Sequence, residues 1–396
     1  MNDESAPDAL ARSTLRIVPL FVAHGVGTAN ITLVVALSPA IEESLGLNHA
    51  GFGLMVSAFY SGMLLFVLPA GWMVDRFGLR AMLVMAFGLV AAGVAILARS
   101  SDLFTGGLAL FLCGTGYAFI NPATARAVLM WFSRRSRATV MGIKQCGVPA
   151  GGVIAAAVVA ANLADWRTLT MAMGIATLAI GMCYLALRVA PQSEAVRVRL
   201  ADIVALFRLP RLALFNAASC LYAVGQAGFF AYLVLYARDG LGVTLAMASL
   251  CLAIAHVASA IGRIVWGIVS DRMVRDGRLA CLVAIGVLAF LSVLMLQNAS
   301  ALGTAGLVVA AALVGFTMGG YAGLTQAATV EAVEPQHAGA AIGYNLLLLS
   351  LGTMIGPAAF GFAVQAMDYG TAWTALAVLV LAGAALYHAS AVVARR

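Results

Sequence analysis

Charged residues are scarce in this chain: only 10% of its 396 residues are Asp, Glu, Lys or Arg, whereas 63% are hydrophobic. The mean hydropathy is +1.00. Soluble globular domains carry about 25% charged residues, so this composition excludes that class. A bilayer-spanning helix needs about 20 apolar residues, and the chain has room for about a dozen. Apolar runs this long also exclude a β-barrel, whose strands alternate with a period of two.

The chain also lacks the signatures of enzymes and of ATP-driven pumps. It contains no P-loop, no GxGxxG turn, no HExxH motif and no serine elbow. Its six cysteines fall inside predicted spans without paired spacing, which favours packing over a disulfide or metal framework. We therefore expect no enzymatic activity, cofactor or metal. An ion gradient or an exchanged solute is expected to drive any transport.

The apolar runs predict an all-α membrane protein with twelve transmembrane helices. The first six spans are expected at about 15–40, 50–75, 80–99, 103–132, 139–162 and 166–189. The other six are expected at about 211–238, 245–271, 278–297, 301–330, 338–366 and 371–391. The first run continues too far to be a cleaved signal peptide.

Basic residues gather on alternate connections and at both tails. Two of these connections contain Arg134, Arg135 and Arg137, and then Arg188, Arg197, Arg199, Arg208 and Arg211. The opposite connections contain acids, namely Glu42, Glu43, Asp102, Asp165, Asp239 and Asp368. Basic connections of membrane proteins face the cytoplasm, so both termini are expected inside the cell. The expected location is a bacterial inner membrane.

One long polar connection interrupts the hydrophobic pattern near the middle of the chain. It runs from Pro191 to Pro210, and all other connections are short. We therefore expect an N-terminal six-helix bundle at 1–190, a cytoplasmic linker at 191–210 and a C-terminal six-helix bundle at 211–396. Short connections also predict that consecutive helices are antiparallel neighbours.

A charged cluster between the second and third spans recurs half a chain later. The first copy consists of Gly71, Asp75, Arg76, Gly78 and Arg80. The second copy has Gly267, Asp271 and Arg272 at an offset of 196 residues, with its further base at Arg278. The simplest interpretation is that these charges only orient the spans. Their recurrence indicates instead that the chain consists of two related halves.

The first cluster at this place, twelve spans and a central linker together resemble the major facilitator superfamily over essentially the whole chain. The family pattern usually has another base after Arg80, where this chain has Ala81. The resemblance implies two bundles that rock about a central substrate site, giving alternating access. It also implies that Asp75 meets the start of a helix in the other half, that Arg76 and Arg80 complete this network, and that a single chain is the functional unit.

Three bases lie inside spans, whereas all acids lie at helix ends or in connections. The bases are Arg126, Lys144, which is the only lysine, and Arg263. Arg263 is eight residues before Asp271, so it lies roughly 12 Å from the helix end, near the bilayer centre. An interior charge is costly, so we expect these bases to bind an anion. Arg126 and Lys144 lie nearer the inner surface and could instead extend to it.

The segment from Gly262 to Gly267 resembles the helix 8 arginine segment of monocarboxylate and oxalate–formate carriers. In those carriers the arginine engages the substrate carboxylate, which implies the same role for Arg263. Monocarboxylate carriers often place an acid one turn earlier, where this chain has Ser259.

Other polar residues on cavity-type helices could complete a site. The substrate-binding candidates are Asn30, Gln226, Tyr321, Gln326, Tyr344 and Asn345, and the proton-coupling candidates are His24 and His256. Each could equally serve as an interhelical hydrogen-bonding group. The run containing Gly147, Pro149 and Gly151 resembles a helix 5 motif of antiporters and is also explained by a kinked, closely packed helix surface.

These patterns predict a secondary transporter for a small organic anion, namely a carboxylate, driven by proton symport or anion exchange. The main alternative is a proton-driven efflux antiporter for drugs or metabolites. Neutral solutes and a sensor role are further alternatives. The expected partners are a small-molecule substrate and the lipid bilayer, with no nucleic acid.

Overall fold

The described part of the chain folds into helices that include twelve candidate membrane spans, as the sequence predicts. The computed structural model describes residues 6–133, 136–187, 206, 208–273, 277–334 and 337–393. In the first half the spans are α1 (Ala6–Ala36), α3 (His49–Phe66), α5 (Leu79–Leu97), α6 (Leu103–Trp131), α7 (Arg137–Gln145) with α8 (Gly147–Ala160), and α9 (Trp166–Cys183) with η1 (Tyr184–Ala186).

The second half repeats this pattern of six spans. They are α11 (Pro210–Leu235) with η2 (Tyr236–Gly240), α12 (Leu245–Arg272), α13 (Gly277–Gln297), α14 (Ala299–Met318) with α15 (Ala322–Glu331), α16 (Ala338–Ala366) and α17 (Tyr369–Val393). Most boundaries lie within a few residues of the predicted ones. All but the end of the 191–210 connection lies outside the described residues.

Two predicted spans near the N-terminus are too long. The first is predicted to continue to residue 40, but α1 ends at Ala36 and α2 (Ser38–Leu45) follows as a separate helix with a proline in its first turn. The second is predicted to continue to residue 75, but α3 ends at Phe66 and α4 (Pro69–Phe77) begins after a break. A proline has no N–H to donate to the preceding turn, so each helix restarts there.

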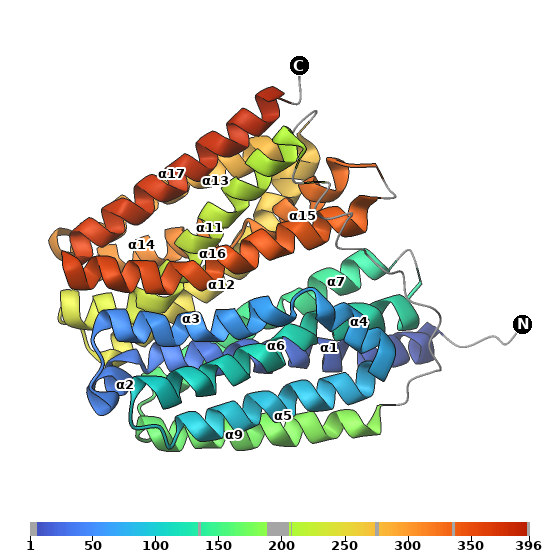
Figure 1. The fold of residues 1–396 in the computed structure, drawn as a ribbon, viewed down its shortest axis with the longest axis horizontal. Helices are drawn as coiled ribbons and strands as arrows, with labels where there is room; N and C mark the ends of the chain where they lie inside the picture. Colours follow the sequence, from blue (N-terminus) through green and yellow to red (C-terminus); the bar gives the residue numbers. More distant parts are fainter. Residues whose placement is uncertain are drawn as a thin grey trace, which may run out of the picture.

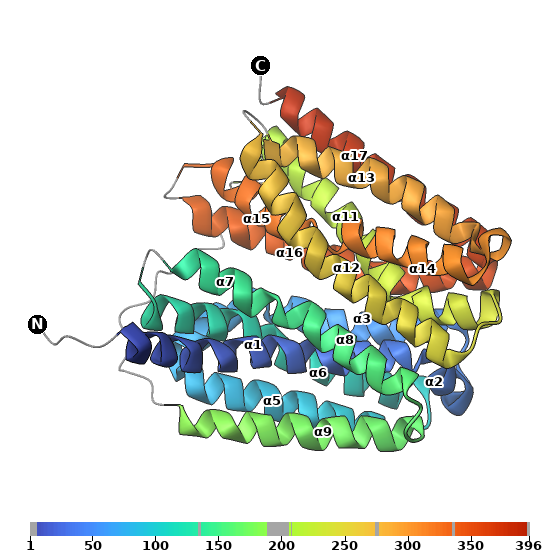
Figure 2. The ribbon, with the colours of Figure 1, turned by 180° about the vertical axis from the view of Figure 1, so that it is seen from behind.

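The two groups of six spans form separate layers. Figures 1 and 2 show α1 to α9 on one side and α11 to α17 on the other. We call these layers the N-half and the C-half. Along the seam between them, α3 packs on α16 and α8 packs on α12. The seam is therefore built mainly from two helix pairs, one on either side of the molecule.

The two ends of the seam differ. We call the end where α1 begins and α17 finishes the linker end, and the opposite end, with α2 and η2, the far end; the ribbons of the halves diverge toward the linker end (Figure 1). At the far end the Tyr232 hydroxyl donates to the His49 carbonyl, and the N–H of Ala358 donates to the Ser57 hydroxyl at 3.1 Å. The far end thus holds the halves together.

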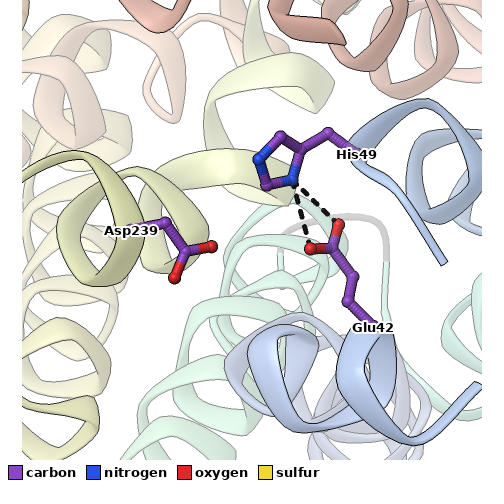
Figure 3. A group of neighbouring side chains, drawn as sticks. All are labelled: Glu42, His49 and Asp239. Carbon is purple, nitrogen blue, oxygen red and sulfur yellow. Dashed lines mark hydrogen bonds and ion pairs between the residues drawn. The ribbon is translucent and has the colours of Figure 1, made fainter. Parts of the chain in front are cut away.

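Three ionisable side chains also meet at the far end, from both halves. Figure 3 shows His49 against Glu42, with Asp239 of the C-half facing them. Nδ1 of His49 lies 3.1 Å from both carboxylate oxygens of Glu42. Burial raises the pKa of Glu42, and the hydrogen bond with His49 opposes that rise. Ionisable groups of both halves therefore lie together at this closed end of the seam.

Candidate functional site

A cavity of about 230 Å³ lies between the two halves, in the middle of the seam. The N-half side of its lining comes from α1, α3, α6 and α8, and the C-half side from α11, α12 and α16. The lining residues are Thr28, Ile31, Thr32, Val35, Val56, Phe59, Tyr60, Met63, Tyr117, Val148, Pro149, Gln226, Ala227, Phe230, Ala231, Leu252, His256, Ser259, Arg263 and Thr353. This lining, formed by described residues, contains no Asp or Glu.

Arg263 is the charged residue of the cavity lining. Its Nε donates a hydrogen bond to the carbonyl of Gly319 at 3.1 Å. Gly319 lies between α14 and α15, where the helix is interrupted and a carbonyl becomes available. This bond orients the guanidinium through one nitrogen and leaves its two terminal nitrogens for other partners. No described carboxylate forms an ion pair with Arg263.

Polar and aromatic groups surround this cation. The hydroxyl of Tyr321 donates to Oε1 of Gln226 at 3.3 Å, so a buried tyrosine orients an amide of the lining. On the N-half side, the hydroxyls of Thr28 and Tyr117 are 3.3 Å apart. Such convergent hydrogen-bonding groups in a mostly apolar cavity are typical of a small-molecule site.

His256 also lines the cavity, at the seam between α8 and α12. Its ring stacks on Phe230 with a centroid distance of 4.7 Å and an interplanar angle of 25°. Across the seam it lies against Gly152, where any Cβ would meet the imidazole. Gly152 therefore allows the histidine of the C-half to approach the N-half backbone closely.

Lys144 lies outside this lining, although it is a predicted binding residue. Its ammonium is buried within the N-half, 2.8 Å from Oδ1 of Asn121 and 3.1 Å from the hydroxyl of Thr124. The third neighbour is Nε2 of His24, at 3.4 Å. The structure thus brings together two residues that the sequence assigned to different roles, substrate binding and proton coupling.

Arg126 lies nearer the linker end and also outside the lining. Its Nε is 3.4 Å from a carboxylate oxygen of Asp75, and both side chains are partly exposed. Asp75 therefore contacts a base of its own half here. Arg76 and Arg80 are exposed beside it.

The remaining polar candidates are placed by helix packing away from the lining. Asn30 donates to the carbonyl of Val26 and to the hydroxyl of Thr177, within the N-half. Asn345 donates to Oδ1 of Asn216 within the C-half. Tyr344 is buried in a small apolar cluster, and Gln326 is half-buried on α15. Among these candidates the cavity lining includes only Arg263, Gln226 and His256, with Tyr321 behind it.

The two charged clusters lie at the linker end. Gly78 separates α4 from α5 with φ of 91°, a conformation that favours glycine. In the second copy, Arg278 is 3.5 Å from Asp271 and 2.8 Å from Glu331. Each acid of the two clusters therefore has a basic neighbour from its own half in this structure.

The helix 5 run lies at a break between α7 and α8. Gly147 and Gly151 face α1 so closely that a Cβ on either would meet its backbone near Phe21 and Gly25. Pro149 faces the cavity. The run therefore combines a tight helix contact with one wall of the candidate site.

Several lining residues escaped the sequence reasoning. Thr28, Tyr60, Tyr117 and Phe230 carry no charge, and hydroxyl or aromatic residues are common in buried helices. The position of Ser259 could have been inferred from the sequence, because it precedes Arg263 by four residues and therefore shares its helix face.

Comparisons with known proteins agree with this architecture. The sequence matches the family profile of the Major Facilitator Superfamily over residues 20–307. It is 27% identical over 363 residues to an uncharacterized MFS-type transporter of Mycobacterium tuberculosis, covering 89% of this chain and 80% of that protein. It is 25% identical over 371 residues to the hexuronate transporter of Bacillus subtilis, covering 88% and 87%.

The fold is also similar to solved structures. The crystal structure of the nucleoside transporter NupG superposes with a TM-score of 0.79 at 15% identity, covering 95% of this chain and 98% of that one. At this identity the match concerns the fold alone. The profile, however, covers well over half of the sequence. This chain therefore belongs to the Major Facilitator Superfamily and is a multi-pass membrane protein that acts as a secondary transporter of a small molecule, not as an enzyme.

Proposed function

We propose that this transporter carries a small organic anion with a carboxylate group, and that Arg263 binds that carboxylate. The observation that carries the proposal is a partly exposed guanidinium in a central cavity whose lining has no acid. The carbonyl of Gly319 holds Nε and leaves two terminal nitrogens, which suit the two oxygens of a carboxylate. An anion would supply the missing counter-charge.

The lining also bears on the alternative of drug efflux. A cationic drug would enter a cavity that already holds a cation and no carboxylate, so its charge would be repelled. The volume of about 230 Å³ is below the ~300–1,000 Å³ of pockets for drug-sized ligands. Both observations favour a small anion. The hexuronate transporter among the relatives is named for a solute of this class.

Gln226, Tyr321 and the Thr28–Tyr117 pair would bind the rest of the solute. Their amide and hydroxyl groups can both donate and accept hydrogen bonds, as the hydroxyl groups of a sugar acid require. The other predicted binding residues contribute indirectly in this proposal. Five of them are surrounded by other protein groups in this conformation: Arg126, Lys144, Asn30, Tyr344 and Asn345. The sixth, Gln326, lies on α15 outside the cavity lining.

The proposed orientation places the linker end in the cytoplasm of a bacterial plasma membrane, with both termini there. The proposed units are the bundles at 1–190 and 211–396, joined by 191–210, and one chain is the functional unit. Closure at the far end then corresponds to access from the cytoplasmic side. Transport would proceed by rocking of the halves about the cavity, with protons or a second anion supplying the driving force.

The charged clusters are proposed to act when the linker end closes. A Cβ added to Gly71 or Gly267 would meet no described atom within 4 Å in this conformation, so neither glycine is needed here for space. Both belong to clusters whose acids contact bases of their own half. Closure would bring the other half against these positions, where Asp75, Arg76 and Arg80 could form contacts across the seam. Gly147, Pro149 and Gly151 would adjust the α1–α8 contact.

Substitution of Arg263 tests the proposed function directly. Binding of D-glucuronate, as a hexuronate probe, and of a panel of other monocarboxylates can be measured by thermal shift and calorimetry on the purified protein. For a carboxylate that binds the wild type, Arg263→Gln should weaken affinity by about 10- to 150-fold, the worth of a charge-assisted hydrogen bond of about 1.5–3 kcal/mol. Arg263→Lys should recover part of this loss, because charge remains but the fork geometry does not.

Arg99→Gln is a suitable control. Arg99 is exposed at the far end of α5, where its NH1 bonds to the carbonyl of Ala95 at 3.1 Å. The Arg99→Gln substitution removes the same charge as Arg263→Gln but lies outside the cavity lining, so anion affinity should stay at the wild-type value. Equal anion affinity in Arg263→Gln and wild type would refute the assignment of Arg263, and tighter binding of organic cations than of carboxylates would refute the substrate class.

A further inference from the structure

Lys144 is a buried cation without a buried anion. Its side chain is 1% exposed, and that of His24 is 2% exposed. No described carboxylate forms an ion pair with Lys144. Burying an ammonium ion without a counter-charge is costly, and a structural role alone would be met more cheaply by an apolar side chain. The location therefore calls for a function in which the charge changes.

The neighbours of Lys144 define where its protons point. The hydroxyl of Thr124 lies 2.7 Å from the carbonyl of Ile120, which takes its one proton. Thr124 therefore accepts from Lys144, as do Oδ1 of Asn121 and Nε2 of a neutral His24. These three acceptors match the three protons of an ammonium ion. They come from α1 and α6, and Lys144 itself from α7.

His24 can exchange roles with Lys144. If Nε2 carries a proton, it becomes a donor to the lone pair of a neutral lysine amine, and the amine keeps two protons for Asn121 and Thr124. The hydroxyl of Thr124, 2.9 Å from Nε2, can accept from either group. The two arrangements differ by the position of one proton between Nζ and Nε2. Both leave Nζ, Nε2 and the hydroxyl of Thr124 with hydrogen-bond partners inside the cluster.

The charge of Arg263 acts on the histidine of this pair. Arg263 of the C-half is close enough to interact with His24 electrostatically. Among the described residues, the charges that act on His24 are those of Lys144 and of Arg263 from α12, and Cys146 is next along the chain at the α7–α8 break. All the charges in this group are positive. An anion beside Arg263 would offset that repulsion, so anion and proton should favour each other's binding.

We propose that Lys144 and His24 form a proton-binding site that holds the proton transported together with the anion. This inference rests on the proposed function, and it selects proton symport over anion exchange. Water delivers the proton past Asn121, which is partly exposed, to Nζ or Nε2. Transfer within the pair breaks one N–H bond and forms the other. Release returns the proton to water on the opposite side, and nothing is oxidised or reduced.

The chain offers an unusually direct test, because Lys144 is its only lysine. Protein without a lysine-containing tag, labelled with ¹⁵N-lysine and ¹⁵N-histidine and reconstituted in lipid, gives one lysine Nζ signal. The Nζ signal should change from ammonium to amine between about pH 5 and 9, where a solvated lysine stays charged. The ring signal of His24, assigned by its loss in His24→Gln, should change over the same pH range because the sites are coupled.

Saturating the protein with a carboxylate that binds Arg263 provides the second arm. The midpoint of the Nζ transition should move to higher pH by about 0.7–2 units, which corresponds to coupling of about 5- to 150-fold. In Arg263→Gln the same addition should move it by less than half as much.

Three outcomes overturn the inference. An Nζ that remains ammonium throughout the pH range is a permanent structural charge. A lysine transition without a His24 transition means that the pair does not share the proton. A shared transition that bound anion does not move means that this proton is not coupled to transport. Failure of the proposed function gives a different result. The purified protein would then bind an organic cation in place of a carboxylate, and that bound cation would leave the titration of Lys144 and His24 at low pH unchanged.

Discussion

Two of the three bases inside the spans, Arg263 and Lys144, occupy contrasting surroundings. Arg263 faces a cavity shared by both halves and uses one nitrogen to bond a backbone carbonyl. Lys144 is enclosed within one half by three acceptors. Neither has a described carboxylate partner. Arg263 therefore has free hydrogen-bonding capacity but retains its proton in any protein, whereas Lys144 has all its protons bonded but can lose one.

This difference assigns the two cations to different tasks. Arginine is suited to a ligand with two oxygens in a plane and cannot be deprotonated in proteins. Lysine is suited to a site whose charge must change. They lie on different helices, α7 and α12, and no hydrogen bond joins them among the described residues. Substitutions at the two positions should consequently affect different steps of transport.

The largest expected effect is the loss of uphill transport in the Lys144→Met variant. A gradient of two pH units can support about 100-fold accumulation when one proton accompanies each anion, since each unit is worth a factor of ten. In proteoliposomes loaded at high pH, Lys144→Met should lower this accumulation to about the external concentration. Counterflow against the same anion should fall far less, because the Arg263 cavity is intact. Arg263→Gln should reduce both assays together.

The comparison of these two variants is decisive. If Lys144→Met lowers accumulation and counterflow in equal proportion, the lysine supports substrate binding or folding, and the division of tasks is wrong. Expression, monodispersity in detergent and Tm of both variants should be measured beside wild type. His24→Gln is the matched variant within the pair: it can still accept a hydrogen bond from Lys144 but cannot hold a proton.

A smaller effect is expected from the acids of the two charged clusters. Asp75 is 24% exposed and contacts Arg126, whereas Asp271 is 68% exposed and shares Arg278 with Glu331. Asp75→Asn should therefore lower transport severalfold, and Asp271→Asn less, because Glu331 still neutralises Arg278. Initial rates at matched expression measure this difference. Tm should change little in either, since such ion pairs contribute about 0–1 kcal/mol.

Equal losses in the two variants would show that the clusters contribute equally to switching. A further variant, Glu331→Gln, separates the possibilities. If Glu331 compensates for Asp271, then Asp271→Asn combined with Glu331→Gln should lower transport more than the sum of the single effects.

Much of the fold could be predicted because it depends on local composition. Long apolar runs and the alternation of basic connections determine twelve spans, and these lie within a few residues of their predicted positions. The errors occurred where a single proline divides an apolar run, at Pro39 and Pro69. Hydropathy averages over such positions, so the breaks are invisible to it.

The site could be predicted only in part, because helix rotation depends on tertiary packing. Depth along a helix follows from residue counting, which indicated that Arg263 is central. The direction of a side chain depends on how the neighbouring helices pack, and the sequence does not give that packing. This applies to Asn30, Lys144 and Asn345. The contact of His24 with Lys144 joins positions 120 residues apart and had no local signal.

The smallest expected effect comes from an exposed charge, and it tests whether burial underlies the comparison of the two cations. Asp165 precedes α9, and its carboxylate accepts from the Thr168 hydroxyl and from the N–H groups of Arg167 and Thr168. These bonds hold the pKa of Asp165 below its usual value. Because the folded-state pKa is depressed, the contribution to stability is present above about pH 4 and disappears as the pH falls through the folded value.

Asp165→Ala should therefore lower Tm by only about 1–2 °C at pH 7, and the difference from wild type should be smaller at about pH 3, below the usual pKa of an aspartate. Asp165→Asn should keep most of the stability at both pH values, since asparagine also accepts from these N–H groups. Anion affinity and accumulation should be unchanged in both variants. A loss of transport comparable to that of Lys144→Met would mean that charge at any depth influences the cycle, and burial would no longer distinguish the interior cations.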